Sequence, residues 1–387
     1  MKKVIRQDPM YRFLVVLTVA SAIGLQGWRT LFNNFAVELA GLNGSQVGII
    51  QSVREIPGFL ALLAVYVLLL MREHRLSALS ILVLGLGVGI TGLLPTMGGL
   101  VITTLVMSFG FHYYETTNQS LTLQYFDQET APVVFGRQRS YAAATNILVG
   151  MAIFGLASFL TYKAMYLLMG VLLCGLGLWG FAQTPDRHNL PLQRRQMVLR
   201  RRYGLYYLLT FLAGARRQIF MAFAVFLMVK RFDFSVQEIT LLFVVNNAIN
   251  YYVSPLIGKA IVRYGERRVL SMEYASMVLI FLAYALVQSK WMVAALYILD
   301  HIFFNFSIAI RTYFQKVSDP RDIAPSMAVG FTINHIAAVV LPAVGGMLWM
   351  VDYRIPFVGG AVLALLSLLC VQLIRLPAKS AKLKASS

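Results

Sequence analysis

Four arginines stand inside long apolar stretches of this sequence, where a membrane-spanning helix would carry them far from either surface. They are Arg29, Arg54, Arg216 and Arg217. A guanidinium group offers planar, often bidentate hydrogen-bond donors to a phosphate or a carboxylate. An arginine at the middle of a membrane helix costs about 2.5–3.5 kcal/mol unless it meets water, a counter-charge or a ligand. We therefore expect these side chains either to bind an anion or to pair with buried carboxylates.

Arg29 and Arg217 open two segments that repeat each other. Residues 29–39 read RTLFNNFAVEL, and residues 217–227, 188 positions later, read RQIFMAFAVFL, with six of eleven positions identical. The repeat favours two related halves that face one another across a basic site. Asn146 and Asn334 match at the same offset, so we interpret them as paired contacts of the cavity wall or between helices. The candidates for substrate binding are Arg29, Arg54, Arg216, Arg217, Asn146 and Asn334.

Carboxylates and histidines at similar depth could relay protons, because burial moves a carboxyl pKa toward neutrality. Glu115 and His112 are three residues apart and share a helical face, whereas Asp300 and His301 are adjacent. The alternative is that such groups only balance arginine charge. Arg54 would then pair with Glu55 or Glu115, and other arginines with Asp300. The candidates for proton coupling are Glu55, His112, Glu115, Asp300, His301 and His335.

The composition indicates what class of protein must position these side chains. The chain has 387 residues, of which 58% are hydrophobic and 13% charged, and its mean hydropathy is +0.69. Soluble domains average about 25% charged residues, so we expect a polytopic membrane protein. The net charge of +18 lies in short connections between apolar runs, which favours a topology signal over a nucleic-acid-binding face. Cys174 and Cys370 lie far apart in apolar runs and predict neither a disulfide framework nor a metal site.

Twelve apolar spans fit the sequence, most of them about as long as a helix needs to cross a bilayer. We place them near residues 11–40, 45–71, 77–94, 98–125, 140–161, 164–183, 204–229, 235–259, 270–288, 291–315, 323–350 and 355–375. With both termini in the cytoplasm, the lysines and arginines of the connections divide 25 to 5 in favour of that side. This count includes Arg137, Arg139 and Arg311, and it predicts that topology.

The one long polar connection, 184–203, separates six spans from six. We therefore expect an N-terminal bundle over 1–183, a basic linker over 184–203, a C-terminal bundle over 204–376 and a basic cytoplasmic tail over 377–387. The size, the short tails and the basic bias suggest the bacterial inner membrane. We also expect a monomer.

Two six-helix halves, a basic central loop and cytoplasmic termini resemble the major facilitator superfamily over residues 11–376. The segment GKAIVRYGERRVL at 258–270 is similar to that family's glycine-and-basic loop motif, although Val262 stands where the motif usually has aspartate. The resemblance assigns a gating role to Gly258, Arg263, Gly265, Arg267 and Arg268.

The fold implied by the resemblance is all-α, with twelve transmembrane helices in two pseudo-symmetric six-helix bundles. Spans 1, 4, 7 and 10 would then line a central cavity, spans 2, 5, 8 and 11 would form its sides, and the other four would face lipid. The deep polar residues are distributed over the spans in the same way, because the middles of spans 3, 6, 9 and 12 carry no comparable polar residue. Paired arginines on the first and seventh helices are similar to the organophosphate transporters of this superfamily.

The function expected is secondary transport of a small organic anion by alternating access, coupled to protons or to anion exchange. The sequence has no nucleophile elbow, P-loop or zinc-ligand spacing, so we expect neither an enzyme, nor a cofactor, nor a metal site. The expected partners are the anion and the lipid bilayer, without nucleic acid. Two alternatives stay open: a proton-driven exporter of cationic or amphipathic compounds, and a lipid-handling protein that keeps the fold for binding.

Overall fold

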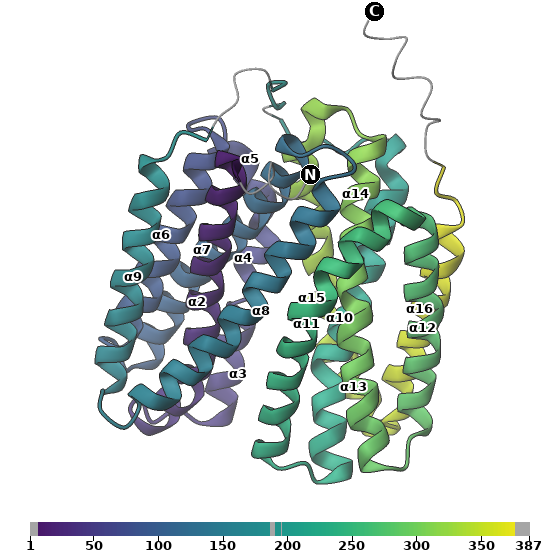
Figure 1. Cartoon of the computed structure of the whole chain (residues 1–387). Helices are drawn as coiled ribbons and strands as arrows, with labels where there is room; N and C mark the ends of the chain where they lie inside the picture. The colour runs from purple at the N-terminus through teal and green to yellow at the C-terminus, as the bar shows by residue number, and fades with distance from the viewer. Residues whose placement is uncertain (1–6, 186–189, 195, 376–387) are drawn as a thin grey trace, which may run out of the picture.

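The computed structural model describes residues 7–185, 190–194 and 196–375 and arranges them as long helices in two groups that lie side by side (Figure 1). Within these residues no β-strand occurs, and nine helical stretches are long and apolar enough to cross a membrane. Three further helices of 26 to 29 residues complete the twelve predicted spans. The predicted tail at 377–387 lies outside the described residues.

The first group packs around α6, which contacts both α7 and α9, and around α2, which contacts α8 and α9. Its elements in chain order are α2 (Pro9–Glu38), α3 (Gly44–Val53), α4 (Ile56–Phe59), the 3₁₀ turn η1 (Leu60–Leu63), α5 (Ala64–Val67), α6 (Glu73–Thr91), α7 (Met97–Tyr125), α8 (Ala131–Leu156) and α9 (Tyr162–Ala182).

The second group packs around α10, which contacts α15 and α16, and around α12, which contacts α16. Its elements are η2 (Arg201–Tyr203), α10 (Gly204–Phe232), α11 (Val236–Tyr264), α12 (Glu266–Leu286), α13 (Lys290–Phe304), η3 (Asn305–Ser307), α14 (Ile308–Val317), η4 (Pro320–Asp322), α15 (Ile323–Val351) and α16 (Arg354–Val371). The division of the chain into these two domains at 184–203 stays a prediction.

Two of the predicted spans are broken helices, which corrects the continuous helices expected there. In the second span, α3 ends at Val53 and α4 begins at Ile56, because Pro57 has no N–H to donate and its ring clashes with the preceding turn. In the tenth span, α13 gives way to η3 at Asn305, whose side-chain amide donates to the His301 carbonyl (2.9 Å) and to Asn250 Oδ1 (2.6 Å). A side chain that binds backbone in this way competes with the helix.

The two groups meet along α8 and α11, and where α15 packs on α7, α4 and η1. Gly258 of α11 lies so close to α8 that a Cβ there would be 2.4 Å from the Pro132 carbonyl oxygen. The Gln315 side-chain amide donates to the carbonyls of Leu123 and Phe126, at 2.7 Å each. We call the end of the molecule that holds these contacts and residues 190–194 and 196–203 the linker end. Figure 1 shows the two groups near each other at the linker end and farther apart at the opposite end.

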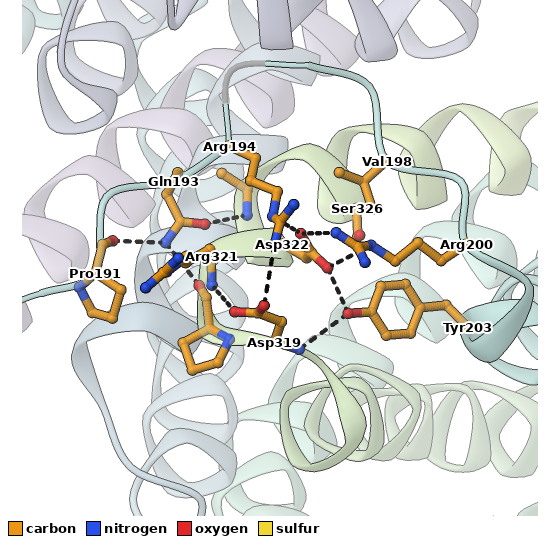
Figure 2. A network of polar contacts seen from close by, with 12 residues as sticks. Pro191, Gln193, Arg194, Val198, Arg200, Tyr203, Asp319, Arg321, Asp322 and Ser326 are labelled. Carbon is orange, nitrogen blue, oxygen red and sulfur yellow. Dashed lines mark hydrogen bonds and ion pairs between the residues drawn. The ribbon is translucent and has the colours of Figure 1, made fainter.

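A buried aspartate fastens the linker to the second group (Figure 2). Asp322, whose side chain is fully buried, lies at the start of α15 and accepts ion pairs from Arg194 (2.8 Å), Arg200 (2.9 Å) and Arg202 (3.2 Å). Tyr203 donates its hydroxyl to the same carboxylate at 2.7 Å. One buried acceptor therefore collects three basic side chains that sequence analysis treated only as a topology signal.

The same turn carries a second aspartate, Asp319, which is only half-buried. The backbone N–H of Arg321 donates to Asp319 Oδ1 at 3.0 Å, and Arg194 lies 3.4 Å from Oδ2. The hydrogen bond first, and the guanidinium second, hold the pKa of Asp319 below its ordinary value.

We expect Asp322→Asn to lower the free energy of unfolding by about 1–3 kcal/mol, because the charge-assisted bonds to the linker are lost while the arginines regain water. Thermal unfolding of the purified protein in detergent measures this. Asp319→Asn is the matched control, and its effect should be smaller because that side chain is half-buried and keeps contact with water. Equal losses in the two variants would contradict the role given to Asp322.

Candidate functional site

A cavity of about 400 Å³ lies between the two groups of helices. Its walls come from α2, α7 and α8 on one side and from α10, the α13–α14 region and α15 on the other. The spans expected to line and flank a central cavity are thus among those that line it. Besides apolar side chains, the wall carries the amide side chains of Gln26, Asn118, Gln119, Gln138, Asn146 and Asn334.

Arginines dominate the charge of the cavity. Arg29 of α2, Arg139 of α8, Arg217 of α10 and Arg311 of α14 all line it, so each group of helices contributes two. Among the described residues, Glu115 of α7 is the one carboxylate in the lining. Four cations against one anion, with histidine neutral, leave the wall with a formal charge of +3.

The cavity arginines have no close carboxylate of their own. Within the described part of the chain, no ion pair joins Arg29, Arg139, Arg217 or Arg311 to an acidic side chain. Arg139 and Arg311 instead lie over the rings of Phe304 and Phe135, at 5.7 and 5.6 Å. Glu115 interacts electrostatically with Arg139, Arg217 and Arg311 but bonds to Gln119 (3.4 Å). The positive charge therefore faces open space.

Arg139 and Arg311 line the cavity, although the sequence-based prediction counts them among the charges of the connections. α8 begins at Ala131, nine residues before the predicted span, so Arg139 lies more than two turns inside a helix. Helical spacing in the sequence could have identified both arginines as cavity residues. Phe135, Arg139, Ala142 and Asn146 recur on one face of α8, as Phe304, Ser307 and Arg311 recur across η3 into α14.

Arg216 does not line this cavity, although it neighbours Arg217 in sequence. It is 3% exposed, lies 3.6 Å from Glu273 Oε1, and stacks over the Tyr274 ring at 4.2 Å. Asp300 lies in the same small pocket. The structure therefore favours internal pairing for Arg216. It also corrects the expectation that the ninth span carries no deep polar residue, because Glu273 is buried in α12.

Arg54 likewise has a partner outside the lining. Its guanidinium lies 2.8 Å from Glu55 Oε1 and 6.0 Å from the centre of the Trp28 ring. It remains within electrostatic range of Arg29 and Arg217. Arg54 thus adds to the positive field without lining the cavity.

The two matched asparagines both line the cavity but do not bond to each other. Asn146 Nδ2 donates to Asn247 Oδ1 across the two groups at 3.0 Å, and Asn334 Nδ2 donates to the Thr210 carbonyl at 3.1 Å. Their role in substrate binding stays a prediction.

The candidates for proton coupling separate into three places. Glu115 and His335 line the cavity, while Glu55 and His112 lie next to His335 behind its wall. Asp300 is buried with Arg216. His301 packs edge to face against the rings of Phe220 and Tyr297 and points Nδ1 at the Tyr297 carbonyl (3.2 Å).

The segment given a gating role lies at the linker end. Gly258 allows α11 to approach α8, and Gly265, with a φ of 79°, separates α11 from α12. Arg263 lies over the Tyr264 ring at 5.3 Å, and Arg267 donates to Gln372 of the same group of helices. The gating role itself, including that of Arg268, stays a prediction.

A water-filled cavity predicts selective chemical labelling along α2. In a background with Cys174→Ser and Cys370→Ser, Ala22→Cys places a thiol in the lining, whereas Ala20→Cys places it where the chain is fully buried. We expect a membrane-impermeant sulfonate thiol reagent to modify the first at least about tenfold faster, because thiolate forms only in contact with water. Equal rates would contradict the cavity.

A sequence profile of the Major Facilitator Superfamily matches residues 11–299 and again 206–387. No curated protein sequence matches the chain.

Solved structures share the fold at low identity. The human organic anion transporter MFSD10 (TETRAN) superposes with a TM-score of 0.77 and 10% identity, over 94% of this chain and 99% of that one. The transporter FucP in its outward conformation, the fucose:proton symporter of E. coli, gives 0.74 and 10% over 95% and 99%. A bacterial homologue of the iron transporter ferroportin, facing outward, gives 0.74 and 12% over 94% and 98%.

Proposed function

The chain belongs to the major facilitator superfamily, and we propose that its substrate is a small organic anion carrying a phosphate or carboxylate group. Membership and fold make it a multi-pass membrane transporter that binds small molecules within a lipid bilayer, and not an enzyme. The observation that carries the proposal is the cavity wall, where four arginines face one carboxylate.

The arginines that line the cavity repel one another. Two unit charges about 6 Å apart repel by roughly 3 kcal/mol at an effective dielectric constant of about 20. An anion placed among the guanidinium groups turns this repulsion into attraction, and it can accept hydrogen bonds from both halves at once. A cation would meet the opposite field. Glu55 and Glu273 are already paired with arginines, and Glu115 of the lining lies in the field of Arg139, Arg217 and Arg311.

The same arrangement supports alternating access between two conformations. The cavity is closed at the linker end by Gln315 and by the packing of Gly258 on α8. If the linker end is cytoplasmic, as the basic connections favour, this conformation faces outward. An anion bridging Arg29 and Arg217 stabilises a state in which the halves close around it, and opening toward the linker then requires the Gln315 bonds to break.

Coupling by protons would act through Glu115, the carboxylate among the described residues that line the cavity. Protonation of Glu115 would raise the formal charge of the wall to +4 and so tighten anion binding. Proton binding and anion binding would then strengthen each other. We place the protein in the bacterial inner membrane with both termini cytoplasmic.

Adjacent arginines on α10 offer a matched test. In proteoliposomes supplied with labelled phosphorylated and carboxylated metabolites, Arg217→Gln should raise the half-saturating concentration of uptake by about 10–100-fold, the loss of one charge-assisted contact. Arg216→Gln should leave that concentration within about threefold and lower the thermal stability instead, because Glu273 loses its partner.

Two outcomes would overturn the proposal. One is saturable anion uptake that Arg217→Gln leaves unchanged. The other is uptake restricted to cationic or neutral compounds in the unmodified protein.

A further inference from the structure

Three side chains distant in sequence meet where the two halves touch behind the cavity wall. Glu55 precedes α4, His112 lies on α7 and His335 lies on α15. One ligand atom from each lies within 4.8 Å of the others. Both histidines are buried, at 4% and 3% exposed, and Glu55 is half-buried. The residues are 57 and 223 positions apart, so no local spacing could show them and sequence analysis expected no metal site.

The hydrogen bonds of both imidazoles suit metal ligands. His112 Nδ1 lies 2.9 Å from the Ser108 carbonyl, and His335 Nδ1 lies 2.8 Å from the Phe331 carbonyl, each one helical turn earlier. A neutral imidazole that donates Nδ1–H to a carbonyl keeps its lone pair on Nε2. Metal-binding histidines are almost always oriented in this way by a second hydrogen bond. The two rings stand edge to face with centres 5.1 Å apart.

The backbone beside Glu55 leaves room for both rings. A Cβ at Gly58 would lie 2.5 Å from His335 Cδ2 and 2.9 Å from His112 Nε2. The break in the second span therefore brings α4 against the imidazole edges and directs His112 Nε2 toward the segment that carries Glu55. Because zinc ligands lie about 2.0–2.2 Å from the metal, they are roughly 3.3–3.6 Å from each other. The separations between the three atoms, at most 4.8 Å, need to shorten by no more than about 1.2–1.5 Å.

We propose that Glu55, His112 and His335 form a binding site for a divalent transition-metal ion that links the two halves of the transporter. Two imidazoles and one carboxylate favour Zn²⁺, Co²⁺ or Ni²⁺ over Mg²⁺ or Ca²⁺, which prefer oxygen ligands. A bound ion joins α4 and α7 of the first half to α15 of the second. His335 also lines the cavity, so the ion lies next to the anion site and can accept a fourth ligand from that side.

Arg54 sets the strength of this site. Its Nη2 and Nε both donate to Glu55 Oε1, at 2.8 and 3.3 Å, which leaves Oε2 for a metal. The guanidinium competes for the carboxylate and repels a divalent cation. Removing it must therefore tighten metal binding, an effect opposite in sign to that of removing a ligand.

The test uses the purified full-length chain in detergent, with Cys174→Ser and Cys370→Ser to exclude thiol ligands. Titration with Co²⁺ should give visible absorption bands of a four-coordinate centre with one equivalent bound, and equilibrium dialysis should give the same stoichiometry for Zn²⁺. We expect His112→Gln, His335→Gln and Glu55→Gln each to weaken binding by at least about tenfold. Arg54→Gln should strengthen it.

His301→Gln is the matched control, because His301 is half-buried and also points Nδ1 at the carbonyl one turn earlier, yet belongs to no such cluster of ligands among the described residues. Its metal affinity should be unchanged. The proposal is overturned if the folded protein binds no ion, if the histidine variants bind as tightly as the parent, or if His301→Gln weakens binding equally. The measurement needs no anion, so its outcome is independent of the transport proposal.

Discussion

An arginine on a membrane-spanning helix has to meet water, a counter-charge or a ligand, and this requirement organises the structure. Adjacent residues of α10 meet it in two ways. Arg216 turns into the protein, where Glu273 and the ring of Tyr274 receive it. Arg217, one residue and about 100° further round the helix, turns to the cavity, and no ion pair joins it to an acidic side chain among the described residues. Helical geometry thus separates an arginine that stabilises the fold from one that can bind a substrate anion.

The cavity depends on helices that are not continuous. Irregular backbone at membrane depth is tolerated where protein or a water-filled cavity surrounds it. The breaks at Arg54–Glu55 and at Asn305 both occur beside the cavity or its wall. The first brings a carboxylate to two histidines, and the second lets α13 and α14 present Phe304, Ser307 and Arg311 to the same space. Both breaks therefore place polar groups where the two halves meet.

Sequence patterns predicted the class of fold, because twelve apolar runs and the basic connections follow directly from burial in lipid. Arg29 and Arg217, which the internal repeat predicts to share one site, both line the cavity. Arg139 and Arg311 escaped prediction because an arginine near the end of an apolar run looks the same whether the helix stops or continues. Glu273 escaped prediction because its pairing with Arg216 is visible only in three dimensions. Pairing across helices has no local signal in one sequence.

The central claim is that the cavity selects negative charge, and matched pairs of ligands test it most directly. Thermal unfolding of the purified transporter is measured with phosphate esters and their parent alcohols, and with carboxylates and their amides. A ligand that binds only the folded state raises the unfolding temperature. The arrangement of arginines predicts stabilisation by charged members and none by their neutral partners. Equal stabilisation by the neutral partners, or stabilisation by cations alone, would contradict it.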